Sequence, residues 1–508
     1  MLPPMTAGPD DAHLIDLASR ALGGSVLAAN DETFAEKENL IKVSAPVFTP
    51  ATMGPRGQIY DGWETRRRRD EGSDWVIVRL GVPGVVHRVV VDTAFFLGNY
   101  PAECSIETCW LDGWPAIDEL IELPYWRMKA ERQKLEGGTA NVVEIPPTLA
   151  THVRLTIHPD GGVARLRVLG EVVPDPRRWA GLTVDLAAAD NGGAVLDASD
   201  RFFSPPENAI RPGHAVTMGD GWETRRRRGG GCDWLLLELA APGEIRQFSI
   251  DTVHFVGNSP GAVRLTAIDS ADPGFADVPA EDWPELLPRT EIQPDTRHWF
   301  GCEAGLDTER TVDRVRVELI PDGGLSRLRL WGVPSADGRS AVGLRWWNLL
   351  PVRDAARQIR SCCASTVWAA TLAEERPVAD LDALCAASER ITLTLPWDEV
   401  VAALAGHPRI GQAPTGKGKE AASSRREQAG VAADPELAQA LAEGNRAYEE
   451  RFDHVYLVRA AGRSGQEMLA LLNERLGNDP TVERDVVRQQ LAEITSLRLR
   501  RLWREGEA

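Results

Sequence analysis

Two identical stretches of the chain carry residue types that can bind a small anion. The nine residues Asp61–Arg69 read Asp-Gly-Trp-Glu-Thr-Arg-Arg-Arg-Arg, and they return letter for letter at Asp220–Arg228, 159 positions later. A guanidinium group presents forked N–H donors that match a carboxylate in two-point geometry. In an extended chain, alternate residues share one face. We therefore expect substrate binding by alternate arginines of each copy: Arg66, Arg68, Arg225 and Arg227. The alternative is that these tetrads form ion-pair networks between the copies or between subunits.

A second group of polar residues follows each arginine tetrad. Asp92-Thr93 returns as Asp251-Thr252, and Gly98-Asn99 returns as Gly257-Asn258. Each copy has one histidine that the other lacks: His254 of the second copy replaces Phe95 of the first, and His158 of the first corresponds to Ile320 of the second. Asymmetric histidines beside a repeated polar set indicate where the two copies differ in function. This half of the chain has no HxH, HExxH or Cys/His cluster, so its spacing predicts no metal site.

The last third of the chain carries a third group. His407-Pro-Arg-Ile-Gly precedes a Gly/Lys loop, and Ser424, Glu427 and Gln428 follow at i, i+3 and i+4, a spacing that brings side chains together on a helix. A histidine at a loop entry can face a cleft. The alternative is a helical bundle in which Ser424 caps a helix and the other two residues lie on its surface.

Composition limits the function classes that remain. The net charge is −18, and residues from 345 onward hold 22 basic against 24 acidic side chains, so the first two-thirds carry about −16. A body this acidic repels a polyanion, which argues against nucleic-acid binding and favours a small anionic ligand at the arginines. No apolar run approaches the roughly 20 residues of a membrane-spanning helix. Seven cysteines without a CxxC motif indicate reduced thiols and a cytoplasmic protein.

The elements that must position these residues follow from the duplication. Short apolar runs alternate with Gly, Pro, Asn and Asp turns through both copies, which favours two tandem antiparallel β-sandwich or jelly-roll repeats. Helical spacing begins after Pro334-Ser-Ala-Asp-Gly-Arg-Ser340 and predicts a small all-α bundle. The predicted organisation is a lead-in at 1–30 with a short helix near 12–22, repeats at 31–172 and 173–334, a linker at 335–344, and the helical domain at 345–508. Expected helices cover 351–371, 381–390, 397–405, 420–429, 435–452, 465–476 and 481–503.

The duplicated half resembles allantoicase. The resemblance rests on Gly219–Arg226, Asp251–Asn258 and Pro321-Asp-Gly-Gly324 and spans about residues 20–335. It implies hydrolysis of allantoate to ureidoglycolate and urea, on two jelly-roll-like repeats that assemble into a homo-oligomer, usually a trimer or hexamer. The arginines suit the substrate's carboxylate, whereas Asp, Glu and Asn side chains, Asn258 included, suit its ureido groups. The catalytic candidates are Asp251, His254 and Glu223, with the counterparts Asp92 and Glu64 in reserve. Whether a divalent metal takes part stays open.

The helical third resembles OHCU decarboxylase, which acts on 2-oxo-4-hydroxy-4-carboxy-5-ureidoimidazoline. The resemblance covers about residues 345–505 and rests on His407–Gly411, Ser424–Gly430, Asn445–Phe452, Arg475–Pro480 and Ile494–Leu499. It implies that His407 and Glu427 form the catalytic pair and that Ser424 and Gln428 hold the substrate's ring or ureido group. It assigns a substrate-binding role to Arg498, although Arg501 lies one turn away. The substrate's own ring can accept charge as CO₂ leaves, so this reaction requires no cofactor.

The combined hypothesis is a bifunctional enzyme of urate and ureide catabolism that acts on small ureides, with no nucleic-acid or membrane partner. Allantoin ring opening lies between the two reactions, so a separate allantoinase would supply the missing step. The runner-up is a tandem β-sandwich binding module, for carbohydrate for example, tethered to an OHCU decarboxylase. Such modules usually present aromatic platforms, whereas the repeated segments here are rich in arginine.

Overall fold

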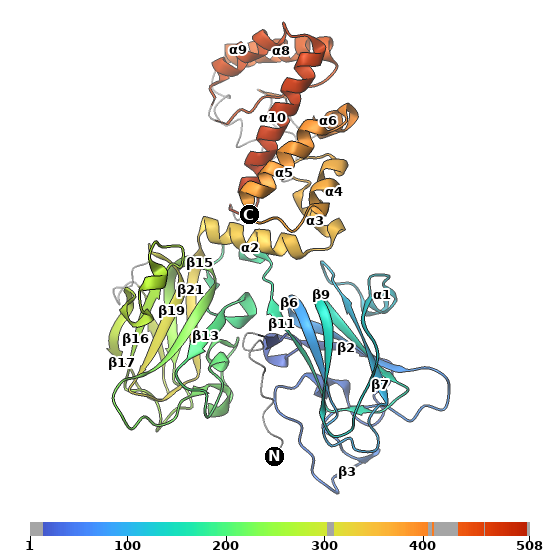
Figure 1. Cartoon of the computed structure of the whole chain (residues 1–508), viewed down its shortest axis with the longest axis vertical. Helices are drawn as coiled ribbons and strands as arrows, with labels where there is room; N and C mark the ends of the chain where they lie inside the picture. The colour runs from blue at the N-terminus through green and yellow to red at the C-terminus, as the bar shows by residue number, and fades with distance from the viewer. Residues whose placement is uncertain (1–13, 302–308, 405–408, 411–434, 462, 505–508) are drawn as a thin grey trace. The chain divides into compact units, whose positions relative to one another are not determined.

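The computed structural model describes residues 14–301, 309–404, 409–410, 435–461 and 463–504. The chain divides into two compact units, Met1–Gly338 and Arg339–Ala508. Strands make up the first unit and helices the second (Figure 1). The predicted fold class, two antiparallel β repeats followed by an all-α part, is therefore confirmed.

Repeat 1 is built around one long, bent strand. The first half of β6 (Asp74–Asp92) pairs with β2, its second half pairs with β11, and the register to β9 shifts between Arg79 and Gly84. The sheet order is β1-β11-β6-β9-β7-β8. Valine-rich alternation along β6 places side chains in one buried apolar cluster, as a half-buried strand requires. The other elements are β1 (Ile15–Asp16), β2 (Ser25–Ala29), β3 (Met53–Gly54), β4 (Gly57–Gln58), β5 (Trp63–Glu64), β7 (Glu103–Cys109), α1 (Ile117–Glu122), β8 (Arg127–Lys134), β9 (Ala140–His158), β10 (Gly162–Val163) and β11 (Arg165–Val172).

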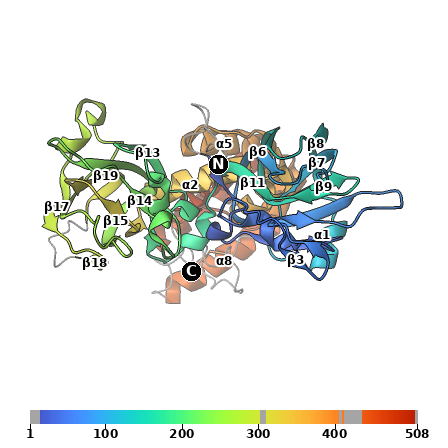
Figure 2. The same ribbon diagram turned by 90° about the horizontal axis from the view of Figure 1, so that it is seen from below.

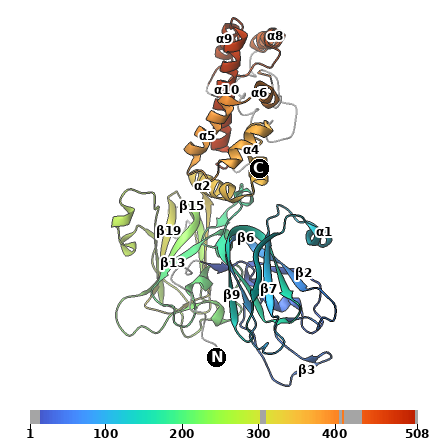
Figure 3. The same ribbon diagram turned by 45° about the vertical axis from the view of Figure 1, so that its right-hand side comes forward.

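Repeat 2 reproduces this plan. Its long strand β15 (Asp233–Asp251) pairs with β13, β18, β19 and β21, in the sheet order β12-β21-β15-β19-β16-β17. Figures 2 and 3 show repeat 1 in blue to cyan and repeat 2 in green to yellow, each with its own sheets. The remaining strands are β12 (Val184–Asp185), β13 (Ala194–Ala198), β14 (Trp222–Glu223), β16 (Ala262–Ile268), β17 (Glu285–Glu291), β18 (Arg297–Phe300), β19 (Thr311–Ile320), β20 (Gly324–Leu325) and β21 (Arg327–Pro334).

Short 3-10 helices connect these strands. They are η1 (Arg20–Leu22), η2 (Lys37–Ile41), η3 (Pro176–Trp179), η4 (Ala189–Asn191), η5 (Pro206–Ile210), η6 (Met218–Asp220), η7 (Phe275–Asp277) and η8 (Ala280–Asp282). The helix expected near residues 12–22 is not formed by the described part of that segment. Ile15 instead pairs with Gly170 in β1, and the chain turns through η1 between the capping residues Ser19 and Gly23. Strands β1 and β2 thus place residues 15–29 of the predicted lead-in within the sheet of repeat 1.

The helical unit begins earlier than the sequence predicts. Helix α2 (Ala336–Leu349) covers most of the stretch expected as a linker, 335–344. The Ser335 hydroxyl accepts from Gly338 N at 3.0 Å, and Trp346 and Trp347 are 1% and 0% exposed, so a capped start and a buried face make this segment helical. Composition alone signals neither feature.

The other described helices follow the predicted spacing with one break. The single helix expected at 351–371 is two helices, because the Ser365 hydroxyl accepts from Trp368 N and starts a new one. Helices α5 and α10 pack side by side, as do α8 and α9 (Figure 3). The bounds are α3 (Val352–Ile359), α4 (Thr366–Glu374), α5 (Leu381–Thr394), α6 (Trp397–Leu404), α8 (Pro435–Phe452), α9 (Gly465–Arg475) and α10 (Pro480–Arg501). The helix expected at 420–429 lies outside the described residues.

Candidate functional site

The repeated Asp-Gly-Trp-Glu-Thr segment packs against the body of its own repeat. Trp63 and Trp222 are both 0% exposed, and each indole N–H donates to a backbone oxygen, that of Asp31 at 2.7 Å or of Asp200 at 3.0 Å. The threonine that follows, Thr224 in repeat 2, is also buried and hydrogen-bonds to Gly323. The tryptophan and threonine of the repeated segment therefore stabilise the fold.

The four predicted anion-binding arginines lie in ion pairs with carboxylates of their own repeat. The first arginine of each tetrad faces one aspartate, and the third faces another that is almost fully buried. Their substrate-binding role stays a prediction, since each already has a carboxylate neighbour. The pairs are Arg66 with Asp31 (3.5 Å), Arg68 with Asp74 (2.6 Å), Arg225 with Asp200 (2.8 Å) and Arg227 with Asp233.

A glutamate–asparagine pair recurs in both repeats. Asn258 Nδ2 donates to Glu223 Oε1 at 2.7 Å, and Asn99 Nδ2 donates to Glu64 Oε1 at the same distance. All four side chains are partly exposed. Burial raises the pKa of the Glu64 carboxyl, against the opposing effect of the Asn99 hydrogen bond. The pair offers a carboxylate oxygen and amide groups, which can accept from and donate to a ureido group.

His254 is held in an unusual backbone conformation beside this pair. Its φ is +75°, its backbone N–H donates to Asp295 Oδ1 at 2.8 Å, and its Nε2 lies 3.1 Å from Ala215 O. A carbonyl oxygen only accepts, so Nε2 carries a proton, and no described residue forms a hydrogen bond with Nδ1. Left-handed backbone at a non-glycine residue is strained and occurs often at functional sites. The ring is therefore held by Nε2, and its Nδ1 is the nitrogen that can exchange a proton with a ligand.

Asp251 meets an arginine that sequence reasoning missed. Asp251 is 2% exposed at the end of β15, and Arg297 of β18 lies opposite it, with Nε and Nη2 3.0 and 2.9 Å from Asp251 Oδ2. Arg297 Nη2 also donates to His214 Nδ1 at 2.9 Å. Arg297 belongs to no repeated motif, so a comparison of motifs passes over it. The sequence signals it only through its place in the run Thr296-Arg297-His298.

Arg327 is a second arginine of this corner. It is 6% exposed, lies opposite Asp251 in the sheet, and donates to the backbone oxygens of Gly213, Asp220 and Ser326. Among the described residues no carboxylate forms an ion pair with it. Burial, chiefly, lowers the pKa of Arg327 to about 10. A buried cation that only carbonyl oxygens solvate favours the arrival of an anion.

Repeat 1 lacks the counterparts of Arg297 and His254. Ala140 lies opposite Asp92 where repeat 2 has Arg297, and burial raises the pKa of the Asp92 carboxyl. Phe95, with φ +70°, replaces His254 and stacks on Phe48 at 5.7 Å between ring centroids, and Phe48 stacks in turn on Tyr60 at 5.2 Å. An aromatic cluster thus stands where repeat 2 carries imidazole and guanidinium groups.

Arg165 and His158 of repeat 1 also have settled contacts within their own repeat. Arg165, the counterpart of Arg327, has a carboxylate partner, because its Nη2 lies 2.6 Å from Asp61 Oδ2. His158 lies between two serine hydroxyls, with Nδ1 2.7 Å from Ser73 Oγ and Nε2 3.1 Å from Ser105 Oγ. Burial lowers the pKa of His158. Both imidazole nitrogens are occupied, so His158 ties strands together.

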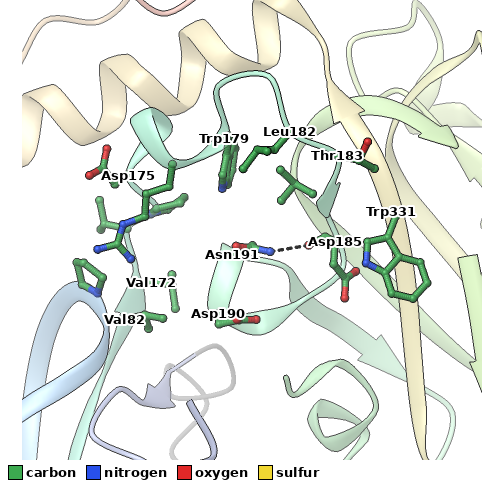
Figure 4. A pocket seen from close by; sticks show the side chains of 15 residues that line it. Val82, Val172, Asp175, Trp179, Leu182, Thr183, Asp185, Asp190, Asn191 and Trp331 are labelled. Atoms are coloured by element: carbon green, nitrogen blue, oxygen red, sulfur yellow. Dashed lines mark hydrogen bonds between the residues drawn. The ribbon is translucent and has the colours of Figure 1, made fainter. Parts of the chain in front are cut away.

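A cavity of about 270 Å³ lies between the repeats (Figure 4). Val82 and Val172 of repeat 1 line it, together with Asp185, Asp190 and Trp331 of repeat 2. None of the predicted site residues lines this cavity. Burial raises the pKa of both carboxyls, which is the expected effect of an apolar surrounding on an acid.

In the helical unit, four of the predicted site residues lie outside the described residues: His407, Ser424, Glu427 and Gln428. Arg498 is described and is 6% exposed on α10, whereas Arg501 is half-buried. Arg498 lies near the Cys363 thiol, whose pKa burial raises to about 11. Burial within the bundle favours Arg498 over Arg501 as the arginine that faces inward.

Two described residues of the His407–Gly411 motif, Arg409 and Ile410, contact α8. Arg409 forms a two-point ion pair with Glu449 at 2.6 and 2.7 Å, and Asn445 Nδ2 donates to Ile410 O at 2.9 Å. These contacts fix the chain two and three residues after His407. Residues 409 and 410 of this motif are therefore held against α8.

A buried ion pair joins two other motifs of the helical unit. Arg475 Nε donates to Glu483 Oε1 at 2.8 Å, the Tyr448 hydroxyl donates to the same oxygen, and Asn478 Nδ2 donates to Oε2 at 2.6 Å. Glu483 is 0% exposed. Tyr448, Arg475 and Asn478 all belong to the motifs that predict the decarboxylase domain, so their contribution is to hold three helices together.

Among the described residues, no three or more His, Cys, Asp or Glu side chains form a cluster that could hold a metal ion. Within those residues no helix has both the length and the apolar character needed to cross a bilayer.

The fold and its motifs define a chain with two enzyme parts, a tandem β-sandwich unit and a helical unit. The allantoicase repeat model matches residues 15–173 and 184–335, and the OHCU decarboxylase model matches residues 348–500. The chain belongs to the allantoicase family and carries an OHCU decarboxylase domain behind its two repeats. Both predicted resemblances are therefore confirmed, as is the prediction of an enzyme of ureide and purine catabolism.

Relatives of the β-sandwich unit support this assignment. A probable allantoicase of Nocardia farcinica is 51% identical over 322 residues, which cover 63% of this chain and 94% of the relative. An allantoicase of Dictyostelium discoideum is 40% identical over 321 residues, covering 62% and 86%. The crystal structure of allantoicase from Saccharomyces cerevisiae is similar at 32% identity and a TM-score of 0.52, covering 63% of this chain and 93% of that one.

Proposed function

We propose that this protein catalyses two separate reactions of ureide catabolism. The β-sandwich unit hydrolyses allantoate to ureidoglycolate and urea, and the helical unit decarboxylates OHCU to (S)-allantoin. Membership of the allantoicase family supports the first reaction and the OHCU decarboxylase domain supports the second. Both matched families are enzymes, which favours catalysis over the alternative of a carbohydrate-binding module.

The observation that carries the hydrolase assignment is the corner of repeat 2 around His254. Its Nε2 donates to Ala215 O at 3.1 Å, and its Nδ1 has no hydrogen-bond partner among the residues that the structure describes. Glu223 and Asn258 offer an acceptor and donors for ureido groups, and Asp251 is fixed by Arg297. This set supplies a base, a ureido-binding pair and a guanidinium group from β14, β15, β18 and the loop that follows β15.

A single side chain can carry the proton through the hydrolysis of allantoate. The reaction breaks the bond between the central carbon of allantoate and one ureido nitrogen, and that carbon gains the hydroxyl of water. His254 Nδ1 takes the proton of the attacking water and returns it to the departing urea nitrogen. Glu223 and Asn258 orient the ureido group. Asp251 takes part as an ion pair with Arg297. General acid–base catalysis of this kind contributes about 10² to 10⁴ in rate.

The decarboxylase assignment retains the roles implied by its family. His407 polarises the substrate's hydroxyl or delivers the proton to the carbanion-like centre, and Glu427 orients His407. Ser424 and Gln428 hold the ring or ureido group, and Arg498 binds substrate from α10. The burial of Arg498 supports this last role, because a desolvated guanidinium group binds a carboxylate more strongly.

Cellular context completes the proposal. Allantoin made by one unit must be opened to allantoate before the other unit can act, so a separate allantoinase would stand between them. Six described cysteines are free thiols, which suits a reducing cytoplasm. We assign the protein to the cytoplasm as a homo-oligomer.

The test of the decarboxylase half uses the optical activity of its product. The wild-type chain should accelerate formation of optically active allantoin from OHCU, and His407→Ala should abolish that acceleration. An unchanged rate in the variant would remove His407 from the catalytic pair. The test of the hydrolase half is urea release from allantoate.

A further inference from the structure

We infer that Arg297 and Arg327 form the anchor for the substrate carboxylate and that only repeat 2 holds a working hydrolytic site. This inference rests on the proposed hydrolysis of allantoate and names the residues and the repeat that carry it. The juxtaposed features are a buried arginine with no carboxylate partner among the described residues and a half-buried arginine across the sheet.

The first step concerns the charge of the two corners. In repeat 2, Arg327 is 6% exposed and donates only to backbone oxygens, while Arg297 pairs with Asp251. In repeat 1, Asp61 lies 2.6 Å from Arg165, and the position of Arg297 is Ala140. Repeat 2 therefore sets Arg297 and Arg327 against Asp251, with Asp220 near Arg327 but not ion-paired with it, whereas repeat 1 pairs Arg165 directly with Asp61 and has no counterpart of Arg297.

The second step concerns the donors that stay available. Arg297 uses Nε and Nη2 toward Asp251 and Nη2 toward His214, and its side chain is 33% exposed. Arg327 uses Nε and Nη1 toward backbone oxygens. The Nη1 of Arg297 and the Nη2 of Arg327 have no partner among the described residues. A carboxylate accepts two such donors, so the free nitrogens match its two oxygens.

The third step concerns the arginines of the repeated motif. Arg225 lies 2.8 Å from Asp200, and Arg227 pairs with Asp233, so each is neutralised within its own repeat. The tetrads are identical in both repeats, so they cannot make one repeat differ from the other. The excess positive charge lies at the corner that also holds His254.

The fourth step concerns access in repeat 1. The stack of Phe95, Phe48 and Tyr60 replaces the imidazole of His254 with apolar rings. An anion placed against these rings would lose hydration without gaining a charged partner, which is unfavourable. The Glu64–Asn99 pair is retained in repeat 1 without a base or an anion partner beside it.

The test separates the anchor from the fold by substrate charge. Arg297→Met in the full-length chain should raise KM for allantoate about tenfold or more and should lower kcat less, because binding of the carboxylate is lost. For the methyl ester of allantoate, which lacks that charge, the variant should lose much less kcat/KM than it loses for allantoate, because only the contribution of the ion pair with Asp251 is removed. Arg297→Lys keeps Asp251 paired and should give an intermediate KM, so a folding defect of the methionine variant does not decide the outcome.

The matched control uses the pair that both repeats share. Asn258→Ala in repeat 2 should raise KM for allantoate, whereas Asn99→Ala in repeat 1 should leave KM within about twofold. An equal effect of the two alanines would overturn the assignment to a single repeat. An unchanged KM in both Arg297 variants would overturn the anchor.

Failure of the proposed hydrolysis has a different signature. If the wild-type chain releases no urea, that reaction is wrong, and calorimetric titration with ureidoglycolate then tests the anchor by itself. Heat of binding that disappears in Arg297→Met supports a carboxylate site at this corner. Heat that persists in the variant removes it.

Discussion

At the scale of single residues, identity between the repeats marks structure, and difference marks the candidate chemistry. Trp63 and Trp222 have the same buried environment and the same type of hydrogen bond to a backbone oxygen. His254 and Phe95 share a left-handed backbone but present a base in one repeat and an apolar ring in the other. A side chain in the same local frame can therefore change its role when the neighbouring loop changes.

The role of His254 predicts unequal effects of matched substitutions. His254→Ala should lower kcat for urea release by about 10² to 10⁴, because the base that accepts the proton of water is lost. Phe95→Ala removes the aromatic ring at the equivalent position of repeat 1 and should leave kcat unchanged. Steady-state kinetics of both variants check this. Comparable losses in the two would show that the role is not specific to repeat 2.

The sequence motifs contain four of the six residues of this corner. Repeated motifs contain or flank all of them, so a comparison of the two copies is enough to predict a site there: Glu223, Asp251, His254 and Asn258. Arg297 and Arg327 become visible only when β18 and β21 are placed on either side of β15. Strand order in an antiparallel sheet depends on long-range pairing, and no local spacing contains that information.

At the scale of elements, buried polar contacts fix the loops and helices that carry the sites. Arg475 is 7% exposed at its side chain and Glu483 is 0% exposed, so the pair joins α9 to α10 in a region without water to replace either partner. Breaking a buried pair costs more than the pair itself contributes, because one charge is left desolvated.

A comparison of two ion pairs in the helical unit tests that difference. Arg475→Met should lower the free energy of unfolding by about 3–5 kcal/mol, since buried Glu483 loses its partner. Arg409→Met breaks the ion pair with Glu449, in which the arginine side chain is 47% exposed, and should lower the free energy of unfolding much less, because water replaces the lost partner. Denaturant unfolding of the full-length chain, monitored in the helical transition, gives both values. Equal costs would contradict the assignment of Arg475 to a desolvated network.

Strand β9 contributes a pH-dependent term through His152. Burial, chiefly, lowers the pKa of His152 to about 4 from an ordinary value of 6.5. Between these values only the unfolded chain binds the proton, so this term stabilises the fold fully above pH 6.5 and is lost as the pH falls toward 4. The change is about 3 kcal/mol. His152→Gln should flatten the unfolding free energy across this range, whereas His87→Gln should retain the slope. A slope unchanged in His152→Gln would contradict this origin.

Element boundaries show where local sequence stops being informative. The predicted linker at 335–344 became α2 because Ser335 caps the helix and two tryptophans bury its far end, and neither effect is visible in composition. The helix expected near residues 12–22 became β1 and η1 because Ile15 pairs with Gly170, more than 150 residues away. The long helices α8 and α10 were predicted closely, since their apolar spacing is regular over many turns.

At the scale of the whole molecule, two compact units carry two chemistries. The proposed hydrolytic residues all lie in Met1–Gly338, and the proposed decarboxylase residues all lie in Arg339–Ala508. In the proposed function allantoin ring opening separates the two reactions, so neither product would be the other unit's substrate. The fusion therefore couples the amounts of the two activities without requiring transfer between sites.

This separation predicts independent kinetics in the full-length chain. His254→Ala should leave the rate of OHCU decarboxylation unchanged, and His407→Ala should leave urea release unchanged. Both rates can be measured on the same preparations, which serve as controls for one another. A loss of both activities in either variant would contradict independence of the units.

The central claim is that the β-sandwich unit is a working allantoicase, and urea is its most direct readout. The purified full-length protein should release one urea and one ureidoglycolate for each allantoate consumed, at a rate that Arg297→Met and His254→Ala reduce and Asn99→Ala does not. Absence of urea above the uncatalysed rate, with divalent metals supplied, would contradict the claim.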